Sequence, residues 1–458
     1  MRWRVVLPLV LALAVSGGAA FVVVDRTGSS TPTRAGNATP APTRPPVLPA
    51  LGTPTAAPAA AAVRKALEPA LRTLPTGEQV GGAVVDVATG TTLWSRDAHT
   101  AIAPASTLKL LTAAAALRSL GPSFRFTTTT RSVGGTVYLV GGGDATLART
   151  ADRDERPISY PAPASLADLA TRTAAALPPG QPIRLRVDDS AWSSPTLAKG
   201  WNDGYVAEGD VTPPNALELN GGRLHPAELD SPRTADPVGQ AGDAFAALLR
   251  KDGVTVRGPL RRAPAPAGAV QLAQVGSPPL AALVARMLTA SDNDLAEAIG
   301  RALAIHDGLP PTFAGAAAAV TAQAVALGVP REELDLQDAS GLSHDDTVTA
   351  AALVTVLRAA SRDADLRPLV EGLPVGGFTG TLADRYRGTE GGAGTGIVRA
   401  KTGSLVGVNA LAGIVVDRSG RLLAFALLGF GTVETAAVQT GLDAAASALA
   451  ASGRAHTG

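Results

Sequence analysis

Hydrophobic and polar positions alternate with two different periods after residue 62, and the period predicts where helices and strands lie. Helical spacing covers residues 63–74, 106–120, 280–288, 294–306, 315–327, 349–360 and 433–450. Strand-like runs cover residues 80–87, 91–94, 397–401, 406–415 and 421–430. Because these strands come from both ends of this part of the chain, we expect one antiparallel sheet flanked by helices.

The pattern changes between residues 131 and 272. Short strand-like runs such as 136–140 and 183–187 alternate here with loops rich in glycine and proline, and few helical patterns occur. We interpret residues 131–272 as an inserted β-rich accessory domain, which divides the helix-flanked domain into residues 63–130 and 273–458. The predicted fold class is therefore α/β of the α+β kind.

The first 62 residues carry a different pattern. Arg2 and Arg4 precede an apolar run from Val5 to Val24 that is long enough, at about 30 Å as a helix, to cross a bilayer. Residues 1–25 are predicted to be a signal or membrane anchor, and the basic residues favour export of the chain beyond the apolar run. Retention as an anchor is favoured, with secretion after cleavage left open. Residues 26–62 are rich in Pro, Thr and Ala, which predicts a disordered linker.

Composition excludes several classes of function. The chain has no cysteine, so it has no disulfide, thiolate nucleophile or cysteine metal site. Its five histidines form no metal-binding motif, and no metal or other cofactor is expected. The formal net charge is only +1, which gives no reason to expect nucleic acid as a partner.

Three short polar motifs are the candidates for chemistry. In chain order they are Ser106-Thr107-Leu108-Lys109, Ser291-Asp292-Asn293 and Lys401-Thr402-Gly403. Ser106 and Lys109 are three residues apart on a predicted helix and share one face. Burial, with Lys401 as a second cation, would lower the pKa of Lys109 and let it accept the proton of Ser106. The start of the helix would stabilise negative charge on a tetrahedral intermediate.

The second motif lies between two helical patterns, where short polar side chains can face a cleft. There the hydroxyl of Ser291 can relay a proton to a leaving amine. The amide of Asn293 can hold the backbone of a peptide substrate.

The third motif opens a predicted strand. Lys401 and Thr402 can bind a substrate carboxylate, and Gly403 would allow the substrate to approach the backbone. The backbone N–H of Ser404 is a candidate second oxyanion donor.

Each motif alone is more often structural: a helix cap, a turn, or the end of a strand. Lysine is scarce in this chain, with 5 lysines against 35 arginines (40 minus 5), and all three motifs in this order are expected by chance on the order of once in a thousand. Residues 338–343 are interpreted as a structural turn, with a role in lining the cleft as the alternative. Residues 141–144 lack a following Gly-Lys-Ser/Thr and are interpreted as a turn rather than a phosphate loop.

Together the motifs are typical of penicillin-binding proteins and class A β-lactamases. The spacing from Ser106 to Ser291, 185 residues (291 minus 106), resembles the class C penicillin-binding proteins, the D-alanyl-D-alanine carboxypeptidase/endopeptidase family of the penicillin-binding protein 4 type, and not compact β-lactamases. Further landmarks of that resemblance are Gly142–Leu147, Ser340–Ser343, Gly380–Leu382 and Arg399–Leu405.

The resemblance implies a β-lactamase/transpeptidase-like fold and a serine peptidase acting on peptidoglycan stem peptides in the cell envelope. Ser106 would be acylated and Lys109 would activate it, while Ser291 and Asn293 would assist proton transfer and binding. β-Lactam antibiotics would trap the same serine. The insertion is short for the family, where it often holds two subdomains. A serine β-lactamase, a D-amino-acid esterase and a non-catalytic wall-bound scaffold remain as alternatives.

Overall fold

The computed structural model describes residues 60–75, 79–150, 161–192, 195, 197–228, 231–387, 392–431 and 435–453. The predicted anchor, residues 1–25, and the predicted linker up to residue 59 lie outside these residues. Residues 60–62 belong to helix α1 and not to a linker, because three consecutive alanines favour helix. Within the described ranges, no helix is both long and apolar enough to cross a bilayer.

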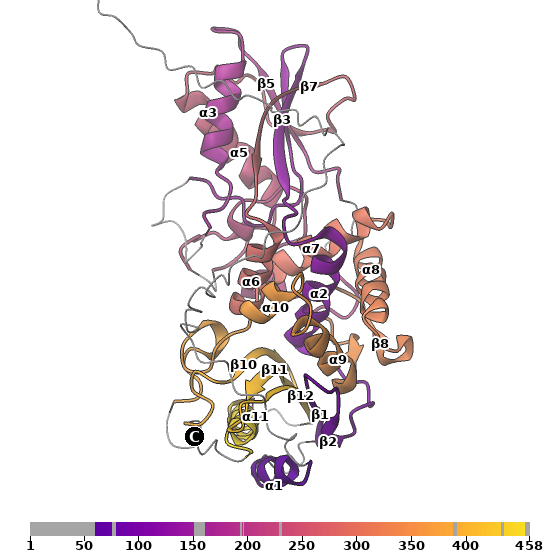
Figure 1. Ribbon diagram of the computed structural model, residues 1–458. Coiled ribbons are helices and arrows are strands. Elements are labelled where there is room, and N and C mark those ends of the chain that lie inside the picture. The colour runs from indigo at the N-terminus through magenta and orange to yellow at the C-terminus, as the bar shows by residue number, and fades with distance from the viewer. Residues whose placement is uncertain are drawn as a thin grey trace, which may run out of the picture. The chain divides into compact units, whose positions relative to one another are not determined.

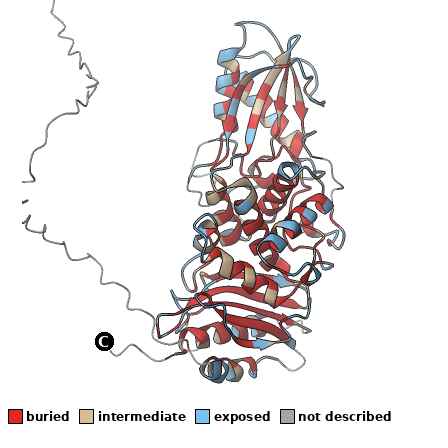
Figure 2. Cartoon of the chain, turned by 45° about the vertical axis from the view of Figure 1, so that its right-hand side comes forward, coloured by how far each residue is buried: buried red, intermediate tan, exposed pale blue. Residues whose placement is uncertain are grey.

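The first sheet joins the two ends of the described chain, as predicted. In spatial order its antiparallel strands are β10 (Arg399–Leu405), β11 (Val408–Val416), β12 (Leu422–Phe430), β1 (Gln79–Asp86) and β2 (Thr92–Arg96). Successive residues of the central strands are buried on both faces, as Figure 2 shows. This explains their continuous apolar runs, since both faces of the sheet are covered by helices.

Two sets of helices cover the sheet (Figure 1). On one face lie α1 (Ala60–Leu71) and α11 (Thr435–Ala450). On the other face lie α2 (Lys109–Leu120), α6 (Leu280–Ala290), α7 (Asn293–His306), α8 (Phe313–Ala326), α9 (Ala350–Ala360) and α10 (Arg367–Glu371). Helix α2 packs at the centre of this second set, and its residues 109–117 are all buried. Position 109 is therefore a core position, although lysine occupies it.

The inserted domain contains a second sheet. In spatial order its strands are β6 (Arg261–Arg262), β5 (Arg184–Asp188), β4 (Thr136–Val140), β3 (Thr127–Val133) and β7 (Val270–Gly276). Strand β3 pairs antiparallel with β4 and β7, whereas β4 with β5 and β5 with β6 pair parallel. Helices α3 (Leu166–Ala176) and α5 (Pro237–Lys251) pack with these strands around one core.

Two features of the predicted insertion need correction. Its boundaries at 131 and 272 fall inside β3 and β7, because β3 begins with Thr127–Thr130, where β-branched residues form a strand without any apolar signal. The description as β-rich also omits α3 and α5. Parallel strands need a crossover connection, and these two helices supply it between β4 and β5 and between β5 and β6.

The remaining elements are short. They are α4 (Tyr205–Glu208), β8 (Leu334–Asp335), β9 (Thr347–Val348), and the 3₁₀ turns Ala105–Leu108, Asn220–Gly222, Arg331–Glu333 and Gly380–Leu382.

Candidate active site

Ser106 lies in a tight turn that precedes helix α2. The helix predicted from residue 106 begins as the 3₁₀ turn Ala105–Leu108 and becomes α-helical at Lys109. Ala105 has a left-handed φ of 46°, a conformation that costs an alanine about 1–2 kcal/mol. The turn that presents Ser106 is therefore strained, and its surroundings must hold it in place.

Two glycines make room for this turn. A Cβ atom at Gly341 would lie 2.0 Å from the carbonyl oxygen of Ala105, and one at Gly403 would lie 2.8 Å from the carbonyl oxygen of Pro104. The absence of a side chain at Gly403 thus makes room for the turn that carries Ser106.

Lys109 lies beside Ser106, as the motif predicted. Its Nζ donates to Ser106 Oγ at 2.9 Å, to Asn293 Oδ1 at 2.6 Å and to the carbonyl oxygen of Ser340 at 2.7 Å. The side chain is fully buried, and burial lowers the pKa of Lys109 from 10.5 to about 8. Nearby carboxylates, Asp338 first, act in the opposite direction. Burial, and not the charge of Lys401, is the main cause of the lowered pKa of Lys109.

A second lysine–serine pair faces the first. Ser291 ends α6 with a left-handed φ of 57°, and its Oγ accepts a hydrogen bond from Lys401 Nζ at 2.9 Å. Lys401 also donates to the carbonyl oxygen of Thr402 at 2.7 Å. Burial, and then the charge of Lys109, hold the pKa of Lys401 well below its ordinary value. Lys401 is fully buried, and its contact with Ser291 connects the third motif to the second.

Strand β10 is the edge strand beside these pairs. The backbone N–H of Ala400 donates to the carbonyl oxygen of Pro374 at 3.0 Å, so this N–H points away from β11. Backbone groups alternate along a strand, so Thr402 and Ser404 share this direction. The candidate oxyanion donor, the N–H of Ser404, therefore faces outward from the sheet. Thr402 Oγ1 donates to Thr381 Oγ1 at 2.8 Å, which places two hydroxyl groups side by side.

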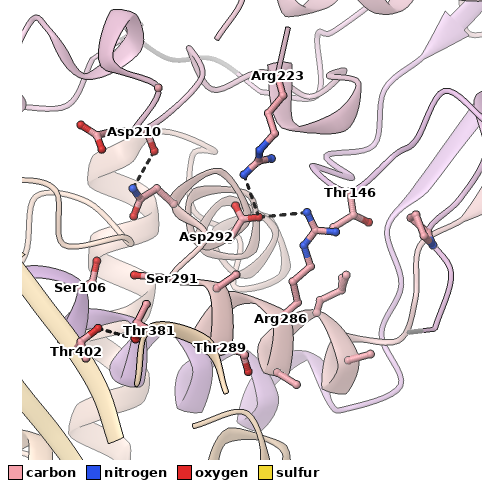
Figure 3. A pocket seen from close by; sticks show the side chains of 18 of the residues that line it. Ser106, Thr146, Asp210, Arg223, Arg286, Thr289, Ser291, Asp292, Thr381 and Thr402 are labelled. Atoms are coloured by element: carbon pink, nitrogen blue, oxygen red, sulfur yellow. Dashed lines mark hydrogen bonds and ion pairs between the residues drawn. The ribbon is translucent and has the colours of Figure 1, made fainter. Parts of the chain in front are cut away.

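The serines open into a cavity of about 890 Å³, shown in Figure 3. Of the predicted site residues, those lining it are Ser106, Ser291, Asn293, Thr402 and Ser404. Lys109, Lys401 and Gly403 lie behind its wall. Polar lining residues that the motifs did not predict are Asp210, Arg223, Arg233, Arg286 and Thr289. No short motif contains them, so the sequence carried no signal for their role.

Residues 338–343 form the structural turn that was predicted, and they also hold Lys109 in place. One buried carboxylate, that of Asp338, accepts the backbone N–H groups of Ser340 at 2.9 Å, Gly341 at 2.6 Å and Ser343 at 2.9 Å. The carbonyl of Ser340 is thereby fixed toward Lys109. Leu342 lines the cavity, so the alternative role of this run is also confirmed.

Residues 141–144 were interpreted as a turn, but the turn lies just after them, where the N–H of Leu147 donates to the carbonyl oxygen of Asp144 at 3.2 Å. The carboxylate of Asp144 accepts hydrogen bonds from the backbone N–H and the hydroxyl of Thr146, at 2.9 and 2.6 Å.

Sequence comparison finds one protein family and several relatives that match most of this chain. The family described as the D-Ala-D-Ala carboxypeptidase 3 (S13) family matches residues 63–234 and 227–452. Carboxypeptidase DacB of Mycolicibacterium smegmatis is 40% identical over 383 residues, covering 82% of this chain and 81% of the relative. The D-alanyl-D-alanine carboxypeptidase of Actinomadura sp. is 30% identical over 441 residues, covering 78% of each chain.

A solved structure extends the likeness to the fold. The crystal structure of penicillin binding protein 4 (dacB) from Haemophilus influenzae has a TM-score of 0.69 at 22% identity, covering 83% of this chain and 97% of that chain. At this identity the likeness concerns the fold, and it confirms the predicted fold class.

Proposed function

Because the chain belongs to the D-Ala-D-Ala carboxypeptidase 3 (S13) family, as its motifs predicted, we propose that it hydrolyses the D-Ala-D-Ala bond of peptidoglycan stem peptides through an acyl-enzyme on Ser106. The observation that carries this proposal is the 2.9 Å contact between Ser106 Oγ and Lys109 Nζ. A buried lysine with a pKa of about 8 has a useful fraction of neutral amine near neutral pH.

The first half of the reaction acylates the serine. Neutral Lys109 accepts the hydroxyl proton as Ser106 Oγ attacks the carbonyl carbon of the penultimate D-Ala. The backbone N–H groups of Ser106 and Ser404 stabilise the resulting oxyanion. The proton that Lys109 accepted passes on through the Ser291 hydroxyl, which Lys401 holds in place, to the amine of the terminal D-Ala as the peptide bond breaks, so Lys109 is neutral again. The ester on Ser106 and free D-Ala remain.

The second half regenerates the enzyme. Water attacks the ester carbonyl, its proton passes to neutral Lys109, and the stem peptide leaves as a carboxylic acid while Ser106 recovers its proton. The hydroxyl groups of Thr402 and Thr381 are placed to bind the terminal carboxylate in the first half, since Thr402 and Thr381 both line the cavity.

Mass analysis of the purified chain tests this mechanism. A defined pentapeptide substrate should lose one D-Ala, and a penicillin should add its own mass to the peptide that contains Ser106. Ser106→Ala should abolish both results because it removes the hydroxyl group that Lys109 contacts. Rapid turnover of penicillin without loss of D-Ala would favour a β-lactamase. Full activity of Ser106→Ala would contradict the acyl-enzyme.

We further propose that the enzyme acts outside the cytoplasmic membrane, held there by residues 1–25. Support comes from the basic residues before the apolar run, from the polar linker after it, and from the external position of peptidoglycan. A C-terminal fusion to a reporter enzyme that is active only after export should be active and should sediment with membranes. Deletion of residues 1–25 should leave the fusion inactive. Activity after that deletion would contradict the proposal.

A further inference from the structure

The Lys109 ammonium has two acceptors besides Ser106, and both come from segments that the inserted domain contacts. These acceptors are Asn293 Oδ1 and the carbonyl oxygen of Ser340. Each fixes one direction of the amine, so together they determine how Lys109 approaches Ser106. The supports of these two acceptors therefore determine the geometry of the catalytic pair.

The first support orients the amide of Asn293. Its Nδ2 donates to the carbonyl oxygen of Asp210, in the inserted domain, at 2.9 Å. With the nitrogen fixed on that side, Oδ1 must face Lys109. The next residue, Asp294, accepts the backbone N–H of Thr212 at 2.6 Å. The start of α7 is thus attached to the inserted domain at two successive residues.

Arg233 connects these contacts into one buried unit. Its guanidinium forms an ion pair with Asp294 at 3.0 Å, donates from Nε to the carbonyl oxygen of Gly209 at 2.9 Å, and donates from Nη1 to the carbonyl oxygen of Gly221. The side chain of Arg233 is only 4% exposed. A planar guanidinium with several fixed donors can hold a carboxylate and two carbonyl groups at once. Arg233 therefore joins the segment at residue 209 to α7.

The second support holds the loop that carries Ser340. The indole Nε1 of Trp201 donates to the carboxylate of Asp338 at 2.7 Å, and the hydroxyl of Ser343 donates to the carbonyl oxygen of Lys199 at 2.8 Å. The same inserted segment that holds Asn293 thus also braces this loop.

We propose that residues 199–223 of the inserted domain, together with Arg233, position the catalytic base, and that Arg233 is a positioning residue acting through Asn293. This inference rests on the proposed function. The inserted domain is then part of the catalytic apparatus, because a shift of about 1 Å in a reacting group can reduce a rate on the order of a hundredfold.

A double-mutant cycle on the purified full chain tests the inference. Acylation by a fluorescent penicillin is followed by stopped flow, which separates the apparent affinity from the acylation rate constant. Arg233→Met should lower the rate constant roughly tenfold to a hundredfold with little change in affinity. Arg233→Lys keeps the charge but loses the donor to Gly209, so its rate constant should be intermediate. If Arg233→Met folds poorly, Arg233→Lys replaces it in the test. In Asn293→Ala, adding Arg233→Met should cause little further loss.

A matched control removes an arginine elsewhere in the same domain. Arg262 forms ion pairs with Asp189 and Asp236 but is half exposed, so Arg262→Met should acylate at the wild-type rate. Thermal unfolding of every variant reports the folded fraction. A wild-type acylation rate constant in Arg233→Met would overturn the inference while leaving the proposed function intact. So would a double variant whose loss in activation free energy equals the sum of the losses in the two single variants. Failure of the wild-type chain to acylate would overturn both.

Discussion

At the scale of single residues, the main feature of the site is its two serine–lysine pairs. Ser106 and Ser291 each contact one buried lysine, and burial is the largest cause that lowers the pKa of each lysine. Since an ammonium is costly to bury, the pKa of each lysine lies below its ordinary value.

The pKa of Lys109 predicts the pH dependence of acylation. Lys109 must be neutral to accept a proton, and with a pKa of about 8 the neutral fraction increases about tenfold per pH unit below that value. The acylation rate constant should rise from pH 6 to 8 and level off above, while the apparent affinity for penicillin stays constant. Stopped-flow measurements between pH 6 and 10 test this. A midpoint near the ordinary lysine value of 10.5 would show that burial does not activate the base.

The sequence predicted the contact between Ser106 and Lys109 but not the other partners of Lys109. Ser106 and Lys109 are three residues apart on one chain segment, so their contact follows from local geometry. The other acceptors of Lys109 are a side chain 184 residues away and a backbone carbonyl 231 residues away. Every residue type has a backbone carbonyl, so no sequence motif can identify the one that accepts from Lys109. The contact of Gly403 with the turn before α2 was not predicted for the same reason, since only the fold shows that Pro104 lies over it.

At the scale of elements, the strained turn before α2 depends on its neighbours. Gly341 has a φ of +81° and lies against the carbonyl of Ala105, whereas Gly420 has a φ of +78° with no atom within 4 Å of its Cβ position. Alanine at either position costs about 1–2 kcal/mol from the backbone conformation. Only alanine at position 341 must also displace the turn that carries Ser106.

This pair of glycines gives a matched prediction. Gly341→Ala should lower the acylation rate constant on the order of a hundredfold, because a Cβ atom moves the nucleophile. Gly420→Ala should lose comparable backbone stability but acylate normally. Penicillin labelling rates and thermal unfolding, measured together, check both expectations. Equal labelling rates would show that the turn tolerates displacement.

Hydrophobic periodicity predicted the first sheet and its helices well, because apolar runs there are long and continuous. Strand β11 is buried along residues 408–415, and its pattern is easily recognised. The inserted domain was predicted less well. Strand β3 begins with four threonines, and α5 begins at a proline within a region of many glycines, so turn-forming residues obscured a real helix.

At the scale of the whole molecule, buried acids make stability depend on pH. Burial, and then the charge of Asp338, raise the pKa of Asp346 from 3.8 to about 10. The folded chain therefore keeps a proton that the unfolded chain releases above pH 4. This contribution to stability is fully present below that pH and is lost as the pH rises toward 10, by at most about 1.4 kcal/mol per unit.

Asp346→Asn tests this dependence. An amide resembles the protonated acid, and its oxygen can still accept the backbone N–H of Gln337, which lies 2.6 Å from Asp346 Oδ1. The melting temperature of the variant relative to wild type should rise from pH 5 to pH 8. Asp384→Asn is the control, because that side chain is 89% exposed and should show no such trend. A constant difference between variant and wild type would contradict the prediction.

The pairing of β3 with β7 has an evolutionary consequence. Thr127 lies opposite Gly276, and the N–H of Leu280 donates to the carbonyl of Phe124 at 2.8 Å, so the chain enters and leaves the inserted domain at adjacent points. One in-frame deletion between these points would leave the path of the remaining chain unbroken. It would also remove Asp210 and Arg233, the supports of Asn293. The inserted domain is thus modular in its connections, but a lineage that lost it would have to evolve a new way of aligning the catalytic base.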